Sequence, residues 1–246
     1  MSELLRCSAL QLAERIRTGR VSSLEVVEAH IRRIQQVNPG LNAVVAERFD
    51  QARREAGTAD RALRTKSPQE LGPLHGVPCT IKEAFALEGM PHTSGLVSRR
   101  GMVAAADATG VARLRAAGAV PLGVTNVSEL CMWMEAHNRV YGRTNNPYHP
   151  GRIVGGSSGG EGAIVAAGGS PFGLAADVGG SIRMPAFFCG VFGHKSTGGV
   201  VPGTSTSGIL HTELAFRQRD PETGALPKPL HYATTHELSS APRFVR

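Results

Sequence analysis

Apolar and polar residues alternate with helical spacing at the start of the chain. Residues 8–19 predict a short amphipathic helix that ends in glycine. A second helix is expected to begin at Ser22, because Glu25 completes a capping box three residues later. Its apolar positions step by three and four until Pro39, which together with the glycine after it is expected to end the helix.

The spacing of apolar residues then changes from helical to short continuous runs. Residues 43–46 predict a short strand, and residues 48–65 predict a polar helix that lies over the surface. Apolar runs bounded by glycine predict buried strands at 77–81, 119–125 and 171–176. Helices are expected between these strands, near 110–117, 127–135 and 160–168. Segments that alternate in this way predict an α/β fold around a largely parallel sheet.

This pattern is lost after Pro202. Residues 203–246 are rich in proline and keep neither a period of two nor one of 3.6. The sequence therefore predicts one domain over residues 1–202, followed by an irregular tail at 203–246.

The basic composition is not that of a nucleic-acid binder. The formal net charge is +7, but Lys and Arg are scattered along the chain and aromatic residues make up only 5%. A nucleic-acid binder would gather its charge on one helix or stripe with aromatics between the charges. We therefore expect no nucleic-acid partner. A generally basic surface leaves a peripheral contact with anionic lipid headgroups open.

The cysteines and the apolar segments indicate the compartment. Four cysteines lie far apart without a CxxC pair: Cys7, Cys79, Cys131 and Cys189. This spacing argues against zinc and against a disulfide framework, and it favours a reducing compartment. The start of the chain lacks the apolar core of a signal peptide, and the most apolar stretch is broken at Pro171. We expect a cytoplasmic protein without a transmembrane segment.

Two serines in glycine-rich settings carry the candidate chemistry. Val178, Gly179 and Gly180 precede Ser181, and two adjacent glycines allow successive backbone N–H groups to converge as in an oxyanion hole. Ser157 is likewise flanked by glycines. Two further residues flank the second serine and are expected to hold its loop in shape through hydrogen bonds: Asp177 and Arg183.

A serine hydroxyl needs a base to act as a nucleophile, and the sequence offers two. Residues 155–159 fit G-x-S-x-G, the nucleophile elbow of α/β-hydrolases, with Asp220 and either His231 or His236 in the right chain order. However, Ser157 follows a polar, proline-broken loop and not a buried strand.

The other candidate base is Lys82. It ends the apolar run 77–81, and burial disfavours the charged form of an amine, which would then accept a proton near pH 7. Alternatively, Lys82 reaches the surface and pairs with Glu83 or another carboxylate.

These segments resemble one family. Residues 155–186 resemble the amidase signature almost position for position, including GGSSGG, the acidic Asp177 and GGSIRMPA. The segment VPCTIKEAF around Lys82 resembles the one that carries the family's catalytic lysine, and residues 125–148 and 188–202 resemble its flanking segments. Within the family the likeness is to fatty-acid amide hydrolases, particularly those of the second type. The resemblance implies the amidase-signature fold, a mixed sheet covered by helices on both faces, of which this chain holds the N-terminal half.

The resemblance also implies residue roles. Ser181 matches the nucleophile, Ser157 the bridging serine and Lys82 the general base, while Ser158 matches a supporting position. The implied oxyanion hole consists of the backbone N–H groups of Val178, Gly179, Gly180 and Ser181. Such a site hydrolyses a small acyl amide through an acyl-enzyme, with fatty-acid amides as the implied substrates, and needs no cofactor and no metal. A homodimer is left open.

Two other functions stay open from the sequence. The first is a glutamine-hydrolysing subunit of an amidotransferase, which shares the amidase signature. The second is a non-catalytic remnant, because the chain departs from the family after about Pro202 and lacks the half that supplies further strands.

Overall fold

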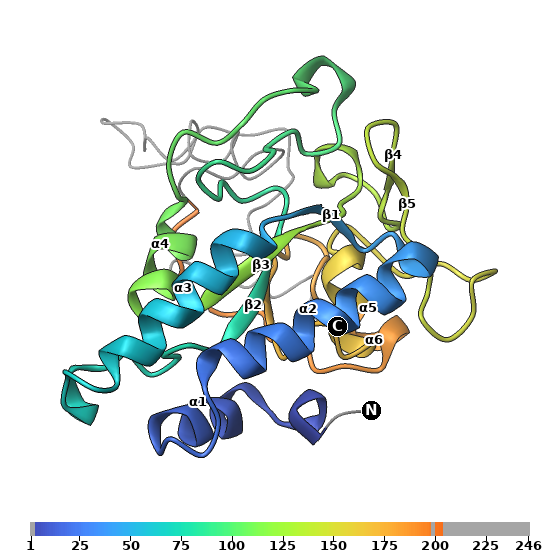
Figure 1. Ribbon diagram of the computed structural model, residues 1–246. Coiled ribbons are helices and arrows are strands. Elements are labelled where there is room, and N and C mark those ends of the chain that lie inside the picture. Colours follow the sequence, from blue (N-terminus) through green and yellow to red (C-terminus); the bar gives the residue numbers. More distant parts are fainter. Residues whose placement is uncertain (1–2, 198–199, 204–246) are drawn as a thin grey trace.

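The computed structural model describes residues 3–197 and 200–203, and a four-stranded sheet runs through its centre (Figure 1). The strands are β1 (Val44–Glu47), β2 (Pro78–Lys82), β3 (Val120–Thr125) and β6 (Gly173–Leu174), in the spatial order β1-β3-β2-β6. β2 runs parallel to β3 and to β6, whereas β1 is antiparallel to β3. The sheet is therefore mixed, which confirms the expected fold class. The predicted tail at 203–246 lies outside the described residues, apart from Gly203.

The helices follow the strands along the chain. They are α1 (Ala9–Arg17), α2 (Ser23–Leu41), α3 (Phe49–Ala62), α4 (Thr109–Ala116), α5 (Gly159–Ala166) and α6 (Arg183–Cys189). Short 3-10 turns occupy Glu3–Arg6, Pro68–Glu70, Val97–Arg99 and Glu129–Cys131, and a small hairpin is formed by β4 (His137–Asn138) and β5 (Gly142–Arg143). Ser8 and Ser22 form capping boxes at α1 and α2, so both predicted helix starts are confirmed.

Helices cover both faces of the sheet. On one face, Val120 and Leu122 of β3 pack in a buried cluster with side chains of α2, α3 and α5, among them Ile164. On the other face, Cys79 and Ile81 of β2 pack against α4 and residues 85–90. Burying large aliphatic side chains of this kind contributes about 1.5–3 kcal/mol each. The two apolar clusters fix the sheet between its helices.

A register shift in β3 sends its last residue to the α5 face. Val124 belongs to the cluster on the α4 face, whereas the hydroxyl of the next residue, Thr125, reaches α5. The pairing of β3 with β2 is irregular between Cys79 and Ile81. Such a bulge changes the direction of the side chains that follow it. Consequently, the polar side chain of Thr125 faces α5, the helix that follows Ser157.

Three predictions of local structure were wrong. α2 continues through Pro39, because the loss of one N–H is tolerated near its end, where Asn42 adopts a left-handed conformation and caps the helix. Residues 127–135 form no α-helix, since Leu130 and Cys131 both have positive φ. The strand expected at 171–176 is only two residues long, and α6 was not anticipated.

Candidate active site

Lys82 ends β2 and points into the protein. Every residue of β2 is buried, and the side chain of Lys82 is fully buried. Its Nζ donates a hydrogen bond of 2.6 Å to Oγ of Ser157, a residue 75 positions further along the chain. Lys82 therefore does not reach the surface to pair with a carboxylate, and the structure brings two of the predicted site residues together.

Glu83, the next residue, is engaged elsewhere. One carboxylate oxygen accepts hydrogen bonds from the backbone N–H of Thr93 at 2.6 Å and from the Tyr141 hydroxyl at 2.7 Å, and the other accepts from the N–H of Ser94 at 2.7 Å. Burial raises the pKa of the Glu83 carboxyl against the opposing effect of these hydrogen bonds. Glu83 thus ties residues 93–94 to the end of β2.

The segment 155–160, here called the Ser157 loop, is held by close backbone packing. A Cβ on Gly156 would lie 2.6 Å from the carbonyl oxygen of Trp133, and one on Gly160 would lie 2.7 Å from the carbonyl oxygen of Ala43. Only glycine fits at such distances. Ser157 itself is fully buried, and the peptide bond that precedes it is cis.

The loop does not have the surroundings of a nucleophile elbow. An elbow follows a strand, whereas residues 144–156 before Ser157 form no strand. The partners considered for that arrangement, Asp220, His231 and His236, lie outside the described residues.

The segment 177–183, here called the Ser181 loop, turns around one carboxylate. Asp177 accepts hydrogen bonds from the backbone N–H groups of Gly180 at 2.7 Å, Ile182 at 3.1 Å and Arg183 at 3.2 Å. The Arg183 guanidinium adds two bonds of 2.9 Å. Burial alone would raise the pKa of Asp177, but the bonds from Arg183 and from the backbone N–H groups lower it to about 2. The turn is therefore built around a carboxylate that is negatively charged at neutral pH.

Ser158 connects the two loops. Its backbone N–H donates to the carbonyl oxygen of Ser181 at 3.3 Å, and its hydroxyl donates to the carbonyl oxygen of Ala176 at 3.2 Å. Within the described residues no hydrogen bond joins the side chains of Ser157 and Ser181. The structure thus places Ser181 on a loop anchored beside Ser157, and it brings only Lys82 and Ser157 into direct contact.

The four backbone N–H groups expected in an oxyanion hole are not equivalent. The N–H of Gly180 is bonded to Asp177. Those of Val178, Gly179 and Ser181 make no hydrogen bond to any residue that the structure describes. Gly180 has φ of 120°, which favours glycine. Among the described residues, three of the four N–H groups therefore have no hydrogen-bond partner.

Sequence reasoning missed a buried polar cluster beneath Lys82. Glu161 of α5 is 5% exposed, and its two oxygens accept hydrogen bonds from the hydroxyls of Thr80 at 2.7 Å and Thr125 at 2.8 Å. Burial raises the pKa of Glu161 to about 7, although both hydrogen bonds and the charge of Lys82 oppose that rise. The sequence did contain a signal for this cluster, since Glu161 stands among glycines and aliphatic residues. An ionisable group is seldom buried without a partner, so its position in an apolar segment indicates a buried polar contact.

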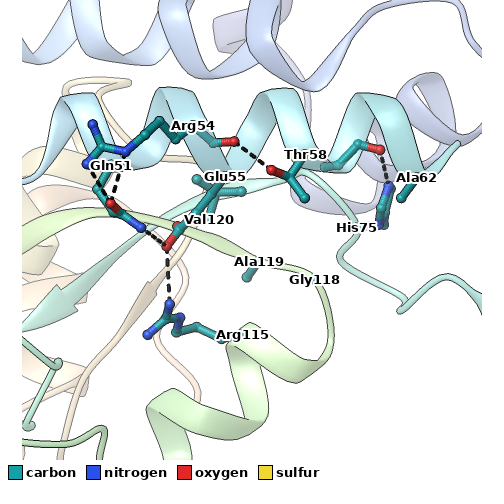
Figure 2. Close-up of a pocket in the computed structure, with 11 residues that line it drawn as sticks. Gln51, Arg54, Glu55, Thr58, Ala62, His75, Arg115, Gly118, Ala119 and Val120 are labelled. Carbon is teal, nitrogen blue, oxygen red and sulfur yellow. Dashed lines mark hydrogen bonds and ion pairs between the residues drawn. The ribbon is translucent and has the colours of Figure 1, made fainter.

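A cavity of about 400 Å³ lies elsewhere, between α3 and the chain that enters β3 (Figure 2). Polar side chains of its lining are already paired: Arg115 pairs with Glu55 at 3.2 Å, and a ring nitrogen of His75 lies 3.0 Å from the backbone carbonyl oxygen of Ala59. None of the predicted site residues lines this cavity. It is not the candidate active site.

The described part of the chain contains no group of three or more His, Cys, Asp or Glu residues that could hold a metal ion. Over the same residues, no helix combines the length and the apolar character that crossing a bilayer requires.

Comparison with known proteins identifies the family to which this fold belongs. The model of the amidase family matches residues 25–218, and the chain belongs to that family. It is 56% identical over 203 residues to fatty-acid amide hydrolase 2-A of Danio rerio, covering 80% of this chain and 38% of that protein. It is 40% identical over 221 residues to a glutamyl-tRNA(Gln) amidotransferase subunit of Acidothermus cellulolyticus, covering 90% of this chain and 43% of that protein.

Solved structures show the same architecture. A fatty acid amide hydrolase superposes with a TM-score of 0.77 at 29% identity, covering 83% of this chain and 36% of that one. The chain therefore spans well under half the length of the relatives it matches, and the fold described here is the N-terminal part of theirs.

Proposed function

We propose that this chain carries the catalytic centre of an amide hydrolase, with Ser181 as nucleophile, Ser157 as proton bridge and Lys82 as general base. The observation that supports it is the 2.6 Å contact between the side chains of Lys82 and Ser157, both fully buried. A lysine shielded from water and aimed at a serine hydroxyl can exchange a proton with it in either direction. No other described cation contacts Ser157.

The reaction relays two protons through Ser157 toward Lys82. Neutral Lys82 takes the proton of the Ser157 hydroxyl, and Ser157 takes that of Ser181 while the Ser181 oxygen attacks the amide carbonyl. The Lys82 ammonium returns the proton through Ser157 to the leaving amine, and water then hydrolyses the acyl-enzyme. Because the described Ser157 and Ser181 side chains are not hydrogen-bonded to each other, this step requires the two hydroxyls to come into contact when substrate binds.

The developing oxyanion would be stabilised by backbone N–H groups of the Ser181 loop. Val178, Gly179 and Ser181 offer N–H groups without described partners. The Gly180 N–H joins them only if it is shared with Asp177 or released from it. Asp177 and Arg183 support this arrangement because they fix the turn from behind.

Long-chain acyl amides are the substrates that we propose. The loop at 129–135 exposes three apolar side chains, Met132, Trp133 and Met134, at 52%, 68% and 44%. Ser128 ties this loop to the site, since its N–H donates to the Ser157 carbonyl oxygen and its hydroxyl accepts from the Trp133 N–H. An apolar surface beside the reacting groups suits an acyl chain, and the similar protein from Danio rerio is named for fatty-acid amides.

The direct test is release of amine from a long-chain acyl amide by the full chain. Lys82→Ala should lower the rate by about 100-fold or more, since general base catalysis contributes 10²–10⁴. Ser181→Ala should abolish covalent capture by a fluorophosphonate probe, and Ser158→Ala is the control that keeps the nucleophile. Persistent labelling of Ser181→Ala at another serine rejects the assignment.

The two alternatives predict different results. A glutamine-hydrolysing role, which the similarity to the Acidothermus cellulolyticus protein favours, should release ammonia from glutamine and leave acyl amides intact. A non-catalytic remnant should show no cooperative thermal transition by circular dichroism and no labelling. Cytoplasmic location, peripheral membrane contact and homodimerisation remain predictions.

A further inference from the structure

A buried carboxyl group faces the same helix–sheet interface as the Lys82 amine. Glu161 lies in the first turn of α5, and its oxygens accept from Thr80 and Thr125. Thr80 precedes Lys82 by two positions in β2, so their side chains lie on one face of the strand. Thr125 is the residue of β3 that pairs with Lys82. The three elements that hold Glu161 are therefore those that hold the Lys82–Ser157 contact.

Capping of α5 does not account for this glutamate. Ser158 and Glu161 have the spacing of a capping box, in which the glutamate would turn back to the start of the helix. In the structure Ser158 makes no side-chain cap, and Glu161 turns to the sheet instead. Gly173 of β6 leaves the room, because a Cβ at that position would overlap a carboxylate oxygen of Glu161. The sheet therefore holds this carboxyl group with two hydroxyl donors and with the space that Gly173 leaves.

Lys82 is among the charged groups that interact with the Glu161 carboxylate. Among the described residues, the charge of Lys82 acts on the Glu161 carboxylate, and the carboxylate in turn acts on the Cys79 thiol, also on β2. Burial raises the pKa of the Cys79 thiol so far that it stays neutral. The N-terminal turn of α5, where Glu161 lies, adds a partial positive charge. A negative charge at Glu161 therefore lies on the same face of the sheet as the Lys82 amine, next to the strand position with which Lys82 pairs.

We propose that Glu161 is a positioning residue that supplies the counter-charge for the Lys82 ammonium formed during acyl transfer. The inference rests on the proposed function. As the Ser181 proton moves to Ser157, the Ser157 proton moves to Lys82 Nζ, and the positive charge stays there until a proton is returned through Ser157 to the leaving amine. Glu161 forms and breaks no covalent bond. Its carboxylate stabilises the positive charge that appears on Lys82 and makes the amine a stronger base.

The first test measures the charge of Lys82 directly. The chain has four lysines, Lys66, Lys82, Lys195 and Lys228, so ¹³Cε-lysine labelling gives few NMR signals, and Lys82→Arg assigns the one of interest. In Glu161→Gln, which keeps the side-chain shape, the titration midpoint of Lys82 should be lower than in the unchanged chain, because an opposite charge at the same helix–sheet interface is removed. An unchanged midpoint overturns the inference.

Glu83→Gln is the matched control. Glu83 is also a buried, hydrogen-bonded glutamate, but its carboxylate faces Thr93, Ser94 and Tyr141. Its substitution should move the Lys82 midpoint much less. An equal shift of the Lys82 midpoint in both variants would mean that Lys82 responds to the loss of any buried negative charge. That result would overturn the specific role of Glu161. Thr125→Val, which removes one donor to the carboxylate, should shift the midpoint in the same direction as Glu161→Gln and by less.

The second test follows the chemistry. The rate of fluorophosphonate labelling at Ser181 should rise with pH in both proteins. In Glu161→Gln the rising limb of the profile should move to lower pH, because a weaker base loses its proton at lower pH. The plateau rate should fall about tenfold, because a weaker base accepts the serine proton less well. A glutamate with only a structural role would lower the melting temperature and leave the limb in place, which would overturn the inference. If the unchanged protein is never labelled, the hydrolase proposal fails, whereas the lysine titration still decides the role of Glu161.

Discussion

The Ser157 loop and the Ser181 loop are both glycine-rich, but different forces hold them. The Ser157 loop packs its backbone against neighbouring backbone, so that Gly156 and Gly160 leave no room for a Cβ. The Ser181 loop is organised by one carboxylate and its hydrogen bonds, and no atom of the described residues, apart from the chain neighbours of Gly179, lies within 4 Å of where a Cβ on Gly179 would be. The same composition therefore produces one loop shaped by packing and another shaped by electrostatics. Substitutions, pH and salt should separate them.

The largest expected effect is on packing in the Ser157 loop. Gly160→Ala should destabilise the chain by about 3 kcal/mol, the upper end of the usual cost of overpacking, because its Cβ would meet the backbone of Ala43 and Asn126. Urea unfolding followed by circular dichroism measures the change. Gly179→Ala is the matched control in the Ser181 loop and should change stability by less than about 0.5 kcal/mol. Equal losses in the two variants would remove the distinction.

The second effect concerns the charge of the Ser181 loop. Asp177→Asn should cost about 2 kcal/mol at pH 7, since the shift of its pKa from 3.8 to about 2 corresponds to a free energy of that size. Because the pKa is lowered by folding, this stability is present above about pH 4 and is lost as the pH falls toward 2. The difference in unfolding free energy between Asp177→Asn and the unchanged chain should therefore shrink between pH 5 and pH 3. A constant difference would contradict this origin.

The smallest effect is expected at the exposed partner of that carboxylate. The Arg183 side chain is 55% exposed, so water and salt screen its charge. Arg183→Gln should cost less than about 1 kcal/mol, and the cost should decrease from low to high salt. The same salt series on Gly160→Ala should show no such trend. A salt-independent cost at Arg183 would indicate that its packing matters more than its charge.

Much of the fold follows from local patterns. The amphipathic helix that begins near Ser8, the capping box at Ser22 and the buried runs of β2 and β3 depend on short-range spacing, and the structure confirms them. Predictions were wrong where a local signal was overruled. Pro39 lies within α2 because the left-handed Asn42 ends the helix later, and residues 127–135 leave the helix where Leu130 takes positive φ. Such conformations depend on contacts with distant segments.

The sequence by itself determined which residue types stand in the site, and the tertiary structure decided which of them meet. Glycine-flanked serines and a lysine at the end of an apolar run can be read locally, because each depends on its own neighbours in the chain. The contact of Lys82 with Ser157 spans 75 positions, and the place of Glu161 depends on strand register, a bulge in β3 and a glycine in β6. Burial and the pKa of an acid depend on what surrounds it in space, which no short-range spacing specifies.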